Sequence, residues 1–568
     1  MTEYELLRII SFLEKIRAPY DEGIGLARPD AYWNILLCLM KATLKGEAIT
    51  KSTLAQSANI PFPSAMRKIS QLIEEGVILE VPKRQYGSSY VLKPSQCLRD
   101  DFSNYASKIK VLLAATFGLG VRSSTDPEEY YFGGSYMEGQ VIPPLKLIEN
   151  RSEKEGSIRF LLHDDNYFAS MSHMWTDFRS GLSARSNFKF LRLPALREEI
   201  LENSAQAESS YDIVAINVPW LGEMSHKSIV RPLDDLIKDS GINQLDFHPD
   251  IWATGTWSEM QFGVPIYSTI ETLNIRKDLF DEHNLPTPGS FEKVLEAAAK
   301  LHQPKRGISG IVWDAARGMP VASSFMFFMA CCGGGVLNVP SSKLFLDYSR
   351  LDPEMYRPRV DSVQGLEALS YMHRLIKYSP PDILQTHWNS ALERFLNGSA
   401  AMIYCWTMRA ARFEYDIRST VKRKVEYLPL PHGSRGPTLS PVGGFLLAIP
   451  KNVSPERAQL AFDAISWMTS PAAMKEHVKN GFPVAPRFSV AADPEAAATT
   501  PIVRMVDRLA KQNKLHRWPR PPIPEYALIE RILGDLIFAA LSGDITDREA
   551  LARSQTEIDQ VMRNAGYY

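Results

Sequence analysis

A chain of 568 residues is too long for one hydrophobic core, which rarely grows beyond about 250–300 residues, so we expect several domains. Hydrophobic residues make up 45% of the chain and charged residues 23%, a composition typical of soluble globular proteins. The five cysteines form no CxxC or Cys/His pattern, which argues against a zinc site, and their odd number argues against a disulfide framework.

The net charge of −1 conceals an asymmetry between two parts of the chain. Residues 28–99 carry ten Lys and Arg against five Asp and Glu, a balance of +5, which leaves −6 for the rest. A basic module on an acidic body fits a nucleic-acid contact at one end, although a chance fluctuation would give the same count.

The N-terminal residues have no basic n-region, no continuous apolar h-region and no small-residue cleavage site. The apolar stretch from Ile35 to Met40 is far shorter than the roughly 20 residues that span a bilayer. We therefore expect a cytoplasmic protein with no membrane contact.

Three helices and a hairpin are predicted in residues 30–92. Asp30 can cap the first helix, which ends at Gly46, and Thr50 can cap a short second helix. A third helix ends at Gly76 and is followed by a strand from Val77 to Val81, a basic tip over residues 82–87, and a strand over 88–92. This order predicts a winged helix-turn-helix domain in residues 1–120.

The same region resembles the MarR-type winged-helix family. The matching positions are Leu54-Ala55, Ile60, Ala65, Ile69, Leu72, Gly76-Val77-Ile78 and Val91-Leu92-Lys93-Pro94. The acidic–arginine wing signature of that family is replaced here by PKRQYGSS, so wing contacts do not carry over.

The third predicted helix, which ends at Gly76, has a length that fits the major groove of double-stranded DNA. Basic side chains around it can neutralise phosphates. The predicted DNA-binding residues are Lys51, Ser52, Ser64, Arg67, Lys68, Gln71, Lys83 and Arg84. The alternative is a winged-helix fold used for contact with another protein, in which the basic residues form a solvated helix face.

Residues 97–117 form an amphipathic pattern that predicts a further helix. Such a helix could pair two subunits into a homodimer, which we expect, or could pack on its own domain. Residues 121–156 mix turn formers with acidic residues and are interpreted as a linker.

From residue 157 onward, strands alternate with helices of 12–18 residues, a pattern that predicts a parallel α/β architecture. In such sheets, ligands bind beyond the carboxyl ends of the strands. The segments of this region resemble family 1 extracellular solute-binding proteins, the maltose-binding-like group. The matching segments are YDIVAINVPW, WATGTWSEMQFGVPIYS, FLNGSAAMIYCWTMRA, PVGGFLLAIPKNV and GFPVAPR. The usual Tyr-Asn after the first crossover strand is replaced by Ile275-Arg276.

The resemblance implies a two-lobed α/β fold of the type II periplasmic-binding-protein class over residues 157–568. Lobe one would hold about 157–267 and 445–500, and lobe two about 270–440 and 500–568. The crossover strands would lie near residues 267–272 and 443–447.

A sugar or polyol offers hydroxyl edges to carboxylates and amides and C–H faces to aromatic rings. The predicted ligand-binding residues are Asp164, Asp165, Asn166, Trp220, Tyr267, Trp313, Asp314, Arg317, Trp406, Gly443, Gly444 and Arg487. The three residues at the first strand end could instead cap the next helix, and the two glycines could simply form a hinge turn.

The sequence shows no nucleophile elbow, no zinc-protease motif and no P-loop, so we expect neither catalysis nor a cofactor. The leading hypothesis is a transcription regulator whose body senses a sugar or polyol and adjusts DNA binding by the head. The alternatives are the solute-binding protein of an ABC sugar transporter, and a binding module whose head docks a protein partner.

Overall fold

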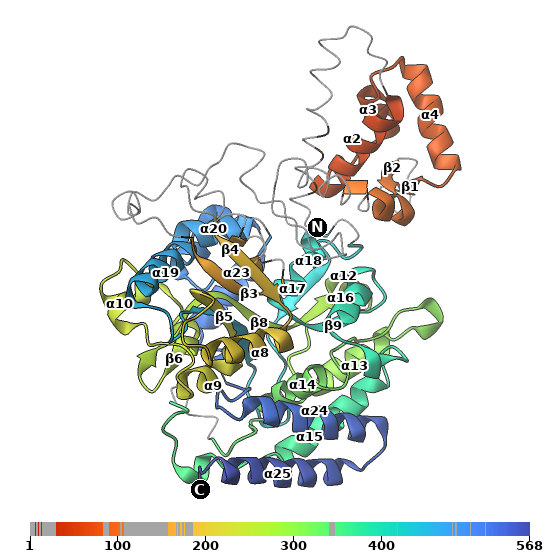
Figure 1. Cartoon of the computed structure of the whole chain (residues 1–568). Coiled ribbons are helices and arrows are strands. Elements are labelled where there is room, and N and C mark those ends of the chain that lie inside the picture. The colour runs from red at the N-terminus through yellow and green to blue at the C-terminus, as the bar shows by residue number, and fades with distance from the viewer. Residues whose placement is uncertain are drawn as a thin grey trace. The chain divides into compact units, whose positions relative to one another are not determined.

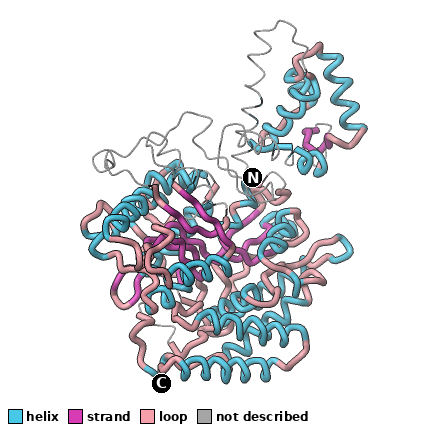
Figure 2. Tube along the Cα trace, viewed as in Figure 1, coloured by secondary structure: helices cyan, strands magenta, loops and turns pink. Residues whose placement is uncertain are grey.

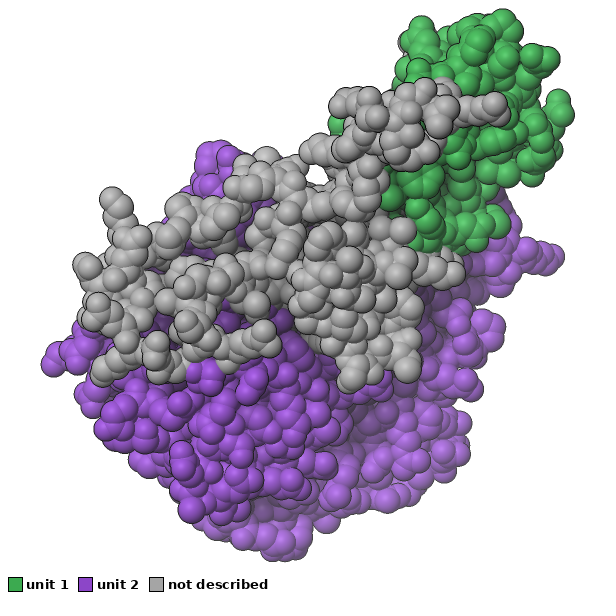
Figure 3. All heavy atoms as spheres, turned by 45° about the horizontal axis from the view of Figure 1, so that its top comes forward, with its two compact units in different colours: residues 1–141, 415–419 green, residues 142–414, 420–568 purple. Residues whose placement is uncertain are grey.

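The computed structural model describes most of the chain. The described ranges are 30–82, 90–102, 105–106, 157–165, 167–168, 171–172, 186–339, 347–416, 419–479, 481–482, 485–499, 501–516 and 518–568, with Leu6, Ile10, Leu13 and Trp175. The chain divides into two compact units, Met1–Val141 with Tyr415–Ser419, and 142–414 with 420–568, which Figure 3 colours separately.

The smaller unit contains the predicted helices and hairpin. Helix α2 (Ala31–Lys45) starts at Asp30, whose carboxylate accepts from the Trp33 backbone N–H, and ends at Gly46 with a φ of 67°. Helix α3 (Lys51–Ser57) is capped by Thr50, and α4 (Phe62–Glu74) follows. Strands β1 (Ile78–Pro82) and β2 (Tyr90–Pro94) pair antiparallel. The capping residues therefore act as the sequence predicts.

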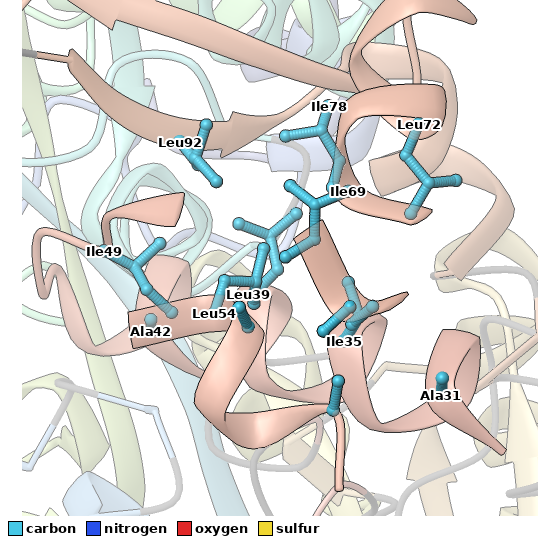
Figure 4. Close-up of a cluster of buried hydrophobic side chains, with 13 residues drawn as sticks. Ala31, Ile35, Leu39, Ala42, Ile49, Leu54, Ile69, Leu72, Ile78 and Leu92 are labelled. Carbon is cyan, nitrogen blue, oxygen red and sulfur yellow. The ribbon is translucent and has the colours of Figure 1, made fainter. Parts of the chain in front are cut away.

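An apolar core joins the three helices to the hairpin (Figure 4). Figure 4 shows side chains from α2, α3, α4, β1 and β2 converging on one cluster. The labelled members are Ala31, Ile35, Leu39, Ala42, Ile49, Leu54, Ile69, Leu72, Ile78 and Leu92. Their helical spacing in α2 and α4 is what brings one face of each helix into this core.

A second apolar cluster covers the opposite face of α2. Phe102 and Ala106 pack there with Leu37, Met40 and Leu44 of α2 and with Leu6, Ile10 and Leu13. Tyr105 meets Trp33 edge-on, with ring centroids 6.2 Å apart. The described part of the amphipathic stripe is thus buried within its own unit, because α2 offers it an apolar face, which is the second possibility that the sequence left open.

The larger unit is built on an eight-stranded sheet, in which β9 and β12 add to β8 and β11 of the order β10-β8-β11-β5-β3-β4. Figure 2 shows strands in magenta in the interior of this unit, with helices in cyan around them. The strands are β3 (Arg159–His163), β4 (Asn187–Leu191), β5 (Ile213–Asn217), β8 (Val264–Arg276), β9 (Met402–Trp406), β10 (Val425–Leu428), β11 (Ser440–Ala448) and β12 (Leu515–His516). Strand β3 pairs parallel with β4 and with β5, which confirms the predicted parallel architecture. A separate hairpin joins β6 (Thr256–Trp257) and β7 (Met260–Gln261).

Strand β8 crosses from one lobe to the other. All thirteen of its residues are buried. Its first half pairs with β11, and its second half pairs with β9 and β10. A strand covered on both faces usually reads as a nearly continuous apolar run, but β8 also buries six polar or charged residues, which are Ser268, Thr269, Glu271, Thr272, Asn274 and Arg276.

Helices cover the sheet on both sides of this crossover (Figure 1). In lobe one they are α8 (Leu193–Ser204), α9 (Leu221–His226), α10 (Asp234–Lys238), α11 (Pro249–Trp252), α19 (Pro455–Met468), α20 (Pro471–Lys479), α21 (Phe488–Ala491), α22 (Pro494–Thr499) and α23 (Pro501–Lys511). In lobe two they are α12 (Lys277–Glu282), α13 (Phe291–Leu301), α14 (Met319–Cys331), α15 (Val363–Ile376), α16 (Trp388–Leu396), α17 (Thr407–Ala410), α18 (Arg412–Tyr415), α24 (Tyr526–Ser542) and α25 (Asp547–Asn564).

The expected lobe boundary at residue 500 lies just before α23. This helix packs on α21 and α22 and also touches β10, whereas α24 packs on α14 and α25. On the contacts with α21 and α22, we group α23 with lobe one. Across the described ranges, no helix combines the length and the apolar character that a membrane span requires.

Candidate solute-binding site

Tyr267 on β8 is tied to the carboxyl end of β3 through Asp165. The Tyr267 hydroxyl donates to Asp165 Oδ2 over 2.8 Å, while Asp165 Oδ1 accepts from the Phe168 backbone N–H, also over 2.8 Å. Asp165 thus caps the following segment and holds a predicted ligand residue at the same time. Burial, reinforced by Asp165, raises the pKa of Tyr267 well above its usual value, so this phenol keeps its proton.

Of the other predicted ligand residues at the strand ends, the structure describes Asp164 and Trp220. The half-buried Asp164 donates its backbone N–H to the Leu191 carbonyl over 2.9 Å, which places it at the end of β3 beside β4. Asn166 lies outside the described residues. Trp220 lies in the short turn of helix directly after β5 and is buried. Both strand ends therefore carry their predicted side chains at the same edge of the sheet.

Alternation along β8 places Tyr267, Thr269 and Glu271 on one face of the strand. The Thr269 hydroxyl lies 3.1 Å from the Thr407 hydroxyl and accepts from the Met408 backbone N–H over 3.1 Å. These bonds fix the start of α17 directly after Trp406. In the register of β8 with β9, Glu271 lies opposite Trp406.

Trp406 is the aromatic platform of this face. Its ring meets Phe327 of α14 edge-on at 5.5 Å, and the Arg520 guanidinium lies over it, 5.2 Å from the ring centre. A Cβ at Gly443 would come within 2.8 Å of the Trp406 ring and 2.9 Å of Arg520 Nη2. Gly443 therefore makes room for the tryptophan, which is the physical reason for a glycine at this point of β11.

Gly444 has a different reason to be glycine. Its φ of 126° is a conformation that side-chain-bearing residues rarely adopt, and a Cβ there would lie 2.3 Å from the Tyr267 carbonyl oxygen. The hinge-turn alternative that the sequence left open therefore explains why residue 444 is a glycine, and no solute contact is needed.

Two carboxyl groups flank the platform, and one of them was not predicted. Glu271 is 5% exposed, and its Oε2 has no hydrogen-bond partner among the described residues. Asp314, which was predicted, also has one buried oxygen, Oδ1, that meets no described donor. Burial, followed by the nearby Asp314, raises the pKa of Glu271 well above its usual value, and burial raises that of Asp314 to about 7.

Arg409 and Arg520 supply the positive charge near these carboxyl groups, and sequence reasoning missed both. Both oppose the pKa rise of Glu271, and Arg409 opposes that of Asp314. Arg409 Nη1 donates to Asn389 Oδ1 over 2.5 Å. Arg520 interacts with Tyr526, whose hydroxyl donates to Glu530. Glu271 is the acidic residue of β8, and this was the sequence signal that could have located the site.

Three other predicted ligand residues have partners elsewhere. Trp313 is completely buried and donates its indole N–H to Ser379 Oγ over 3.1 Å, so it is a core residue. Arg487 is 2% exposed, lies over Phe247 and donates to the Thr469 carbonyl and to Asp246, so it locks lobe one internally. Arg317 forms an exposed ion pair with Asp535 of α24 over 2.8 Å.

The predicted DNA-binding residues of the smaller unit are partly engaged within that unit. Lys51 pairs with Glu80 over 2.7 Å, and Lys68 lies 3.9 Å from the centre of the Tyr32 ring. Gln71 accepts from Tyr32 and donates to Glu75, and Arg67 donates to Ser64. Ser52 is exposed, and Lys83 and Arg84 lie outside the described residues. Intramolecular partners thus compete with the expected phosphate contacts.

The fold of the larger unit, two lobes joined by crossover strands, defines the class of periplasmic-binding-protein-like α/β proteins. The family described as bacterial extracellular solute-binding protein matches residues 198–475. This match lies within the larger unit and agrees with the sequence resemblance to family 1 solute-binding proteins.

Known relatives agree with this assignment. A mannitol-binding protein of Pseudomonas aeruginosa is 25% identical over 391 residues, which cover 66% of this chain and 85% of the relative. An ABC transporter solute-binding protein of Agrobacterium radiobacter, solved with ribitol, matches with a TM-score of 0.65 at 24% identity over 71% of this chain and 98% of its own. One from Agrobacterium vitis, solved with D-mannitol, gives 0.62 at 21% identity over 72% and 99%.

These comparisons correct two expectations. The transcription-regulator hypothesis is wrong, because the matching proteins are solute-binding proteins, among them ABC transporter components, and they favour the transporter alternative instead. The expected cytoplasmic location is also wrong, because the matching family is extracellular. The basic balance that suggested DNA binding is confined to residues 28–99, whereas the body that matches the solute-binding family makes up most of the chain.

Proposed function

We propose that this protein is the solute-binding component of an ABC transporter for a sugar or polyol. The observation that carries the proposal is the platform of Trp406, cleared by Gly443 and flanked by Glu271 and Asp314, on the strands that join the lobes. The relatives from Pseudomonas and Agrobacterium, named for mannitol or solved with polyols, support the same class of solute.

The roles of the site residues follow from their chemistry. The Trp406 ring would cover a C–H face of the solute, while carboxyl groups and the Tyr267 hydroxyl would bond its hydroxyl groups. Asp164, Asp165 and Trp220 would contact the solute from the ends of β3 and β5. Because β8 and β11 cross between the lobes, a solute held against them could be enclosed by a hinge motion.

Isothermal titration calorimetry of the full chain with ribitol, D-mannitol and maltose tests the proposal. We expect binding of at least one of them, together with a rise in melting temperature, since a ligand that binds only the native state stabilises it. Replacing Trp406 with Ala should weaken that binding by about tenfold or more. The matched control is Trp252→Ala, which removes a half-buried ring that packs on Phe247 in lobe one. Absence of binding to all three solutes would reject the proposal.

For the smaller unit we propose only a fold, the winged helix. Three helices followed by an antiparallel hairpin support it, as does the Leu92 backbone N–H that donates to the Ile49 carbonyl over 2.8 Å. Amide hydrogen exchange of the full chain should show protection in β1, β2 and the Leu92 amide. Rapid exchange throughout the hairpin would contradict this fold.

A further inference from the structure

Residues 347–351, which we call the strap, are anchored in lobe two. The anchor is Tyr356, whose hydroxyl donates to the Tyr348 carbonyl over 2.8 Å and accepts from the Leu351 backbone N–H over 3.2 Å. The Tyr356 ring is buried and packs on Tyr567, just after α25, with ring centroids 4.3 Å apart. The base of the strap therefore moves with lobe two.

The tip of the strap contacts the β6–β7 hairpin. The Ser258 hydroxyl donates to Ser349 Oγ over 2.9 Å, and Ser349 in turn donates to Asp347 Oδ1 over 2.5 Å. Beside these hydrogen bonds, Arg350 forms an ion pair with Glu259 over 3.2 Å. Two adjacent strap residues therefore bond to two adjacent residues of the hairpin turn.

The hairpin belongs to lobe one and has an unusual turn. Gln261 in β7 donates its backbone N–H to Asp234 over 3.1 Å and accepts from the Leu233 backbone N–H over 2.7 Å. The turn residues Ser258 and Glu259 have φ of 51° and 63°, a left-handed conformation that Asn and Gly adopt more readily. Such strained turns persist where other contacts hold them, and they are often found at functional positions.

The strap also contacts the segment that carries Arg520. The Tyr348 ring meets the Trp518 ring edge-on, with centroids 6.2 Å apart. Trp518 lies between β12 and α24, two residues before Arg520, and the Arg520 guanidinium lies over the Trp406 ring. The strap therefore ends on the segment that supports the aromatic platform of the candidate site.

The lobes are in contact in the arrangement that forms the strap bonds. The turn Val218–Trp220 of lobe one packs on α24 of lobe two. A Cβ at Gly222 in α9 would lie 1.8 Å from the Pro522 carbonyl oxygen, so lobe one also approaches the segment before α24 closely. A hinge opening that separates these surfaces would break the strap contacts too, because a hydrogen bond is lost beyond about 3.5 Å.

We propose that the strap holds the two lobes closed over a bound solute and thereby slows its release. This inference rests on the proposed function and adds a device that sets how long the solute stays bound. Each contact of the strap is weak, and the side chains of Arg350 and Glu259 are 58% and 78% exposed. The strap thus favours the closed state without locking it, as delivery of the solute requires.

A disulfide in place of the hydroxyl contact tests the strap directly. Ser258→Cys/Ser349→Cys puts thiols where two hydroxyl oxygens lie 2.9 Å apart, so oxidation should join the lobes, which peptide mass spectrometry detects. The probe is whichever of D-mannitol, ribitol and maltose binds most tightly in calorimetry, and it is loaded before oxidation. Stopped-flow displacement should show release about a hundredfold slower than from the same variant after reduction, which is the matched control.

Loosening the strap should have the opposite effect. Tyr348→Ala/Arg350→Ala removes the ring contact and the ion pair, and release should become about tenfold faster. Glu259→Arg alone should accelerate release about twofold, and Glu259→Arg/Arg350→Glu should restore the wild-type rate. The control is Lys293→Glu, which breaks an exposed ion pair with Glu296 inside α13 and should leave the rate unchanged. Circular dichroism establishes that each variant is folded.

The outcomes separate this inference from the proposed function. If a solute binds but leaves the cross-linked and the loosened variants at the wild-type rate, the strap is overturned and the proposed function stands. Failure of the two cysteines to cross-link in the folded variant overturns the strap as well. A wild-type protein that binds none of the three solutes overturns the proposed function and this inference with it.

Discussion

Lobe one and the crossover treat buried carboxyl groups in opposite ways. In lobe one, the side chain of Asp212 is 1% exposed and accepts hydrogen bonds from Arg159 and Arg457. Burial alone would raise the pKa of Asp212, but these bonds outweigh it and the pKa is lowered. At the crossover, Glu271 and Asp314 keep unpaired oxygens and raised pKa values. The paired carboxylate of Asp212 stabilises lobe one, whereas the unpaired carboxyl groups lie in the site that we propose for the solute.

The largest effect is expected from removing the paired carboxylate of lobe one, Asp212. Asp212→Ala would leave two partly buried arginines without their shared anion, and we expect the free energy of unfolding to fall by about 3 kcal/mol. Urea denaturation followed by circular dichroism measures this. Solute affinity of the folded variant should stay unchanged. A loss below about 1 kcal/mol would show that the two arginines do not depend on Asp212.

The second prediction concerns the crossover, where an added methyl group would crowd Trp406. Gly443→Ala would place a methyl group within 2.8 Å of the Trp406 ring, and overpacking of this kind costs about 1–3 kcal/mol. We expect solute affinity to fall by roughly tenfold as the ring is displaced. Gly241→Ala is the control, since a Cβ there meets no atom within 4 Å. Equal solute affinity of the two variants would show that Trp406 does not contact the solute.

The third prediction concerns pH. The pKa of Asp314 is about 7 in the folded protein, against about 4 in an unfolded chain. The folded state therefore holds this proton longer, so the free energy of unfolding declines as pH rises from about 4 to about 7. Asp314→Asn removes this decline, and its stability relative to the wild type should improve by about 1 kcal/mol for each pH unit over that range. Thermal melts at pH 5 and 8 measure the difference, which should not depend on pH if Asp314 titrates normally.

The smallest effect is expected at an exposed pair. Arg317→Ala removes the ion pair with Asp535, whose side chains are 67% and 48% exposed, and water screens such pairs strongly. We expect less than about 0.5 kcal/mol in stability and no change in solute affinity. A tenfold loss of affinity by calorimetry would restore Arg317 to the site and contradict its placement on the surface.

The sequence predicted the fold well because caps and periodicity are local signals. Asp30, Thr50 and Gly46 bound their helices as expected, and alternating strands and helices indicated the parallel sheet. Side-chain direction is not a local signal. Trp313 and Arg487 occur in the right segments but bond to Ser379 and Asp246, partners distant in sequence.

Glu271 and Arg520 were not predicted as site residues, because their positions also depend on tertiary contacts. Glu271 is an acidic residue within a strand that the tertiary fold buries on both faces, and this burial is not visible in the sequence. Arg520 reaches Trp406 across more than one hundred positions of the chain. Only the antiparallel register of β8 with β9 and β11 brings Glu271, Trp406 and Gly443 together.

That register also limits how the gene can change. Because neighbouring side chains on β8 point to opposite faces, one codon inserted between Tyr267 and Glu271 would turn the glutamate away from the tryptophan without altering any other amino acid. Substitution can therefore tune which solutes are accepted, whereas insertions and deletions in these five positions would abolish recognition. Loops elsewhere in the body are free of this constraint, so variation in chain length should be confined to them.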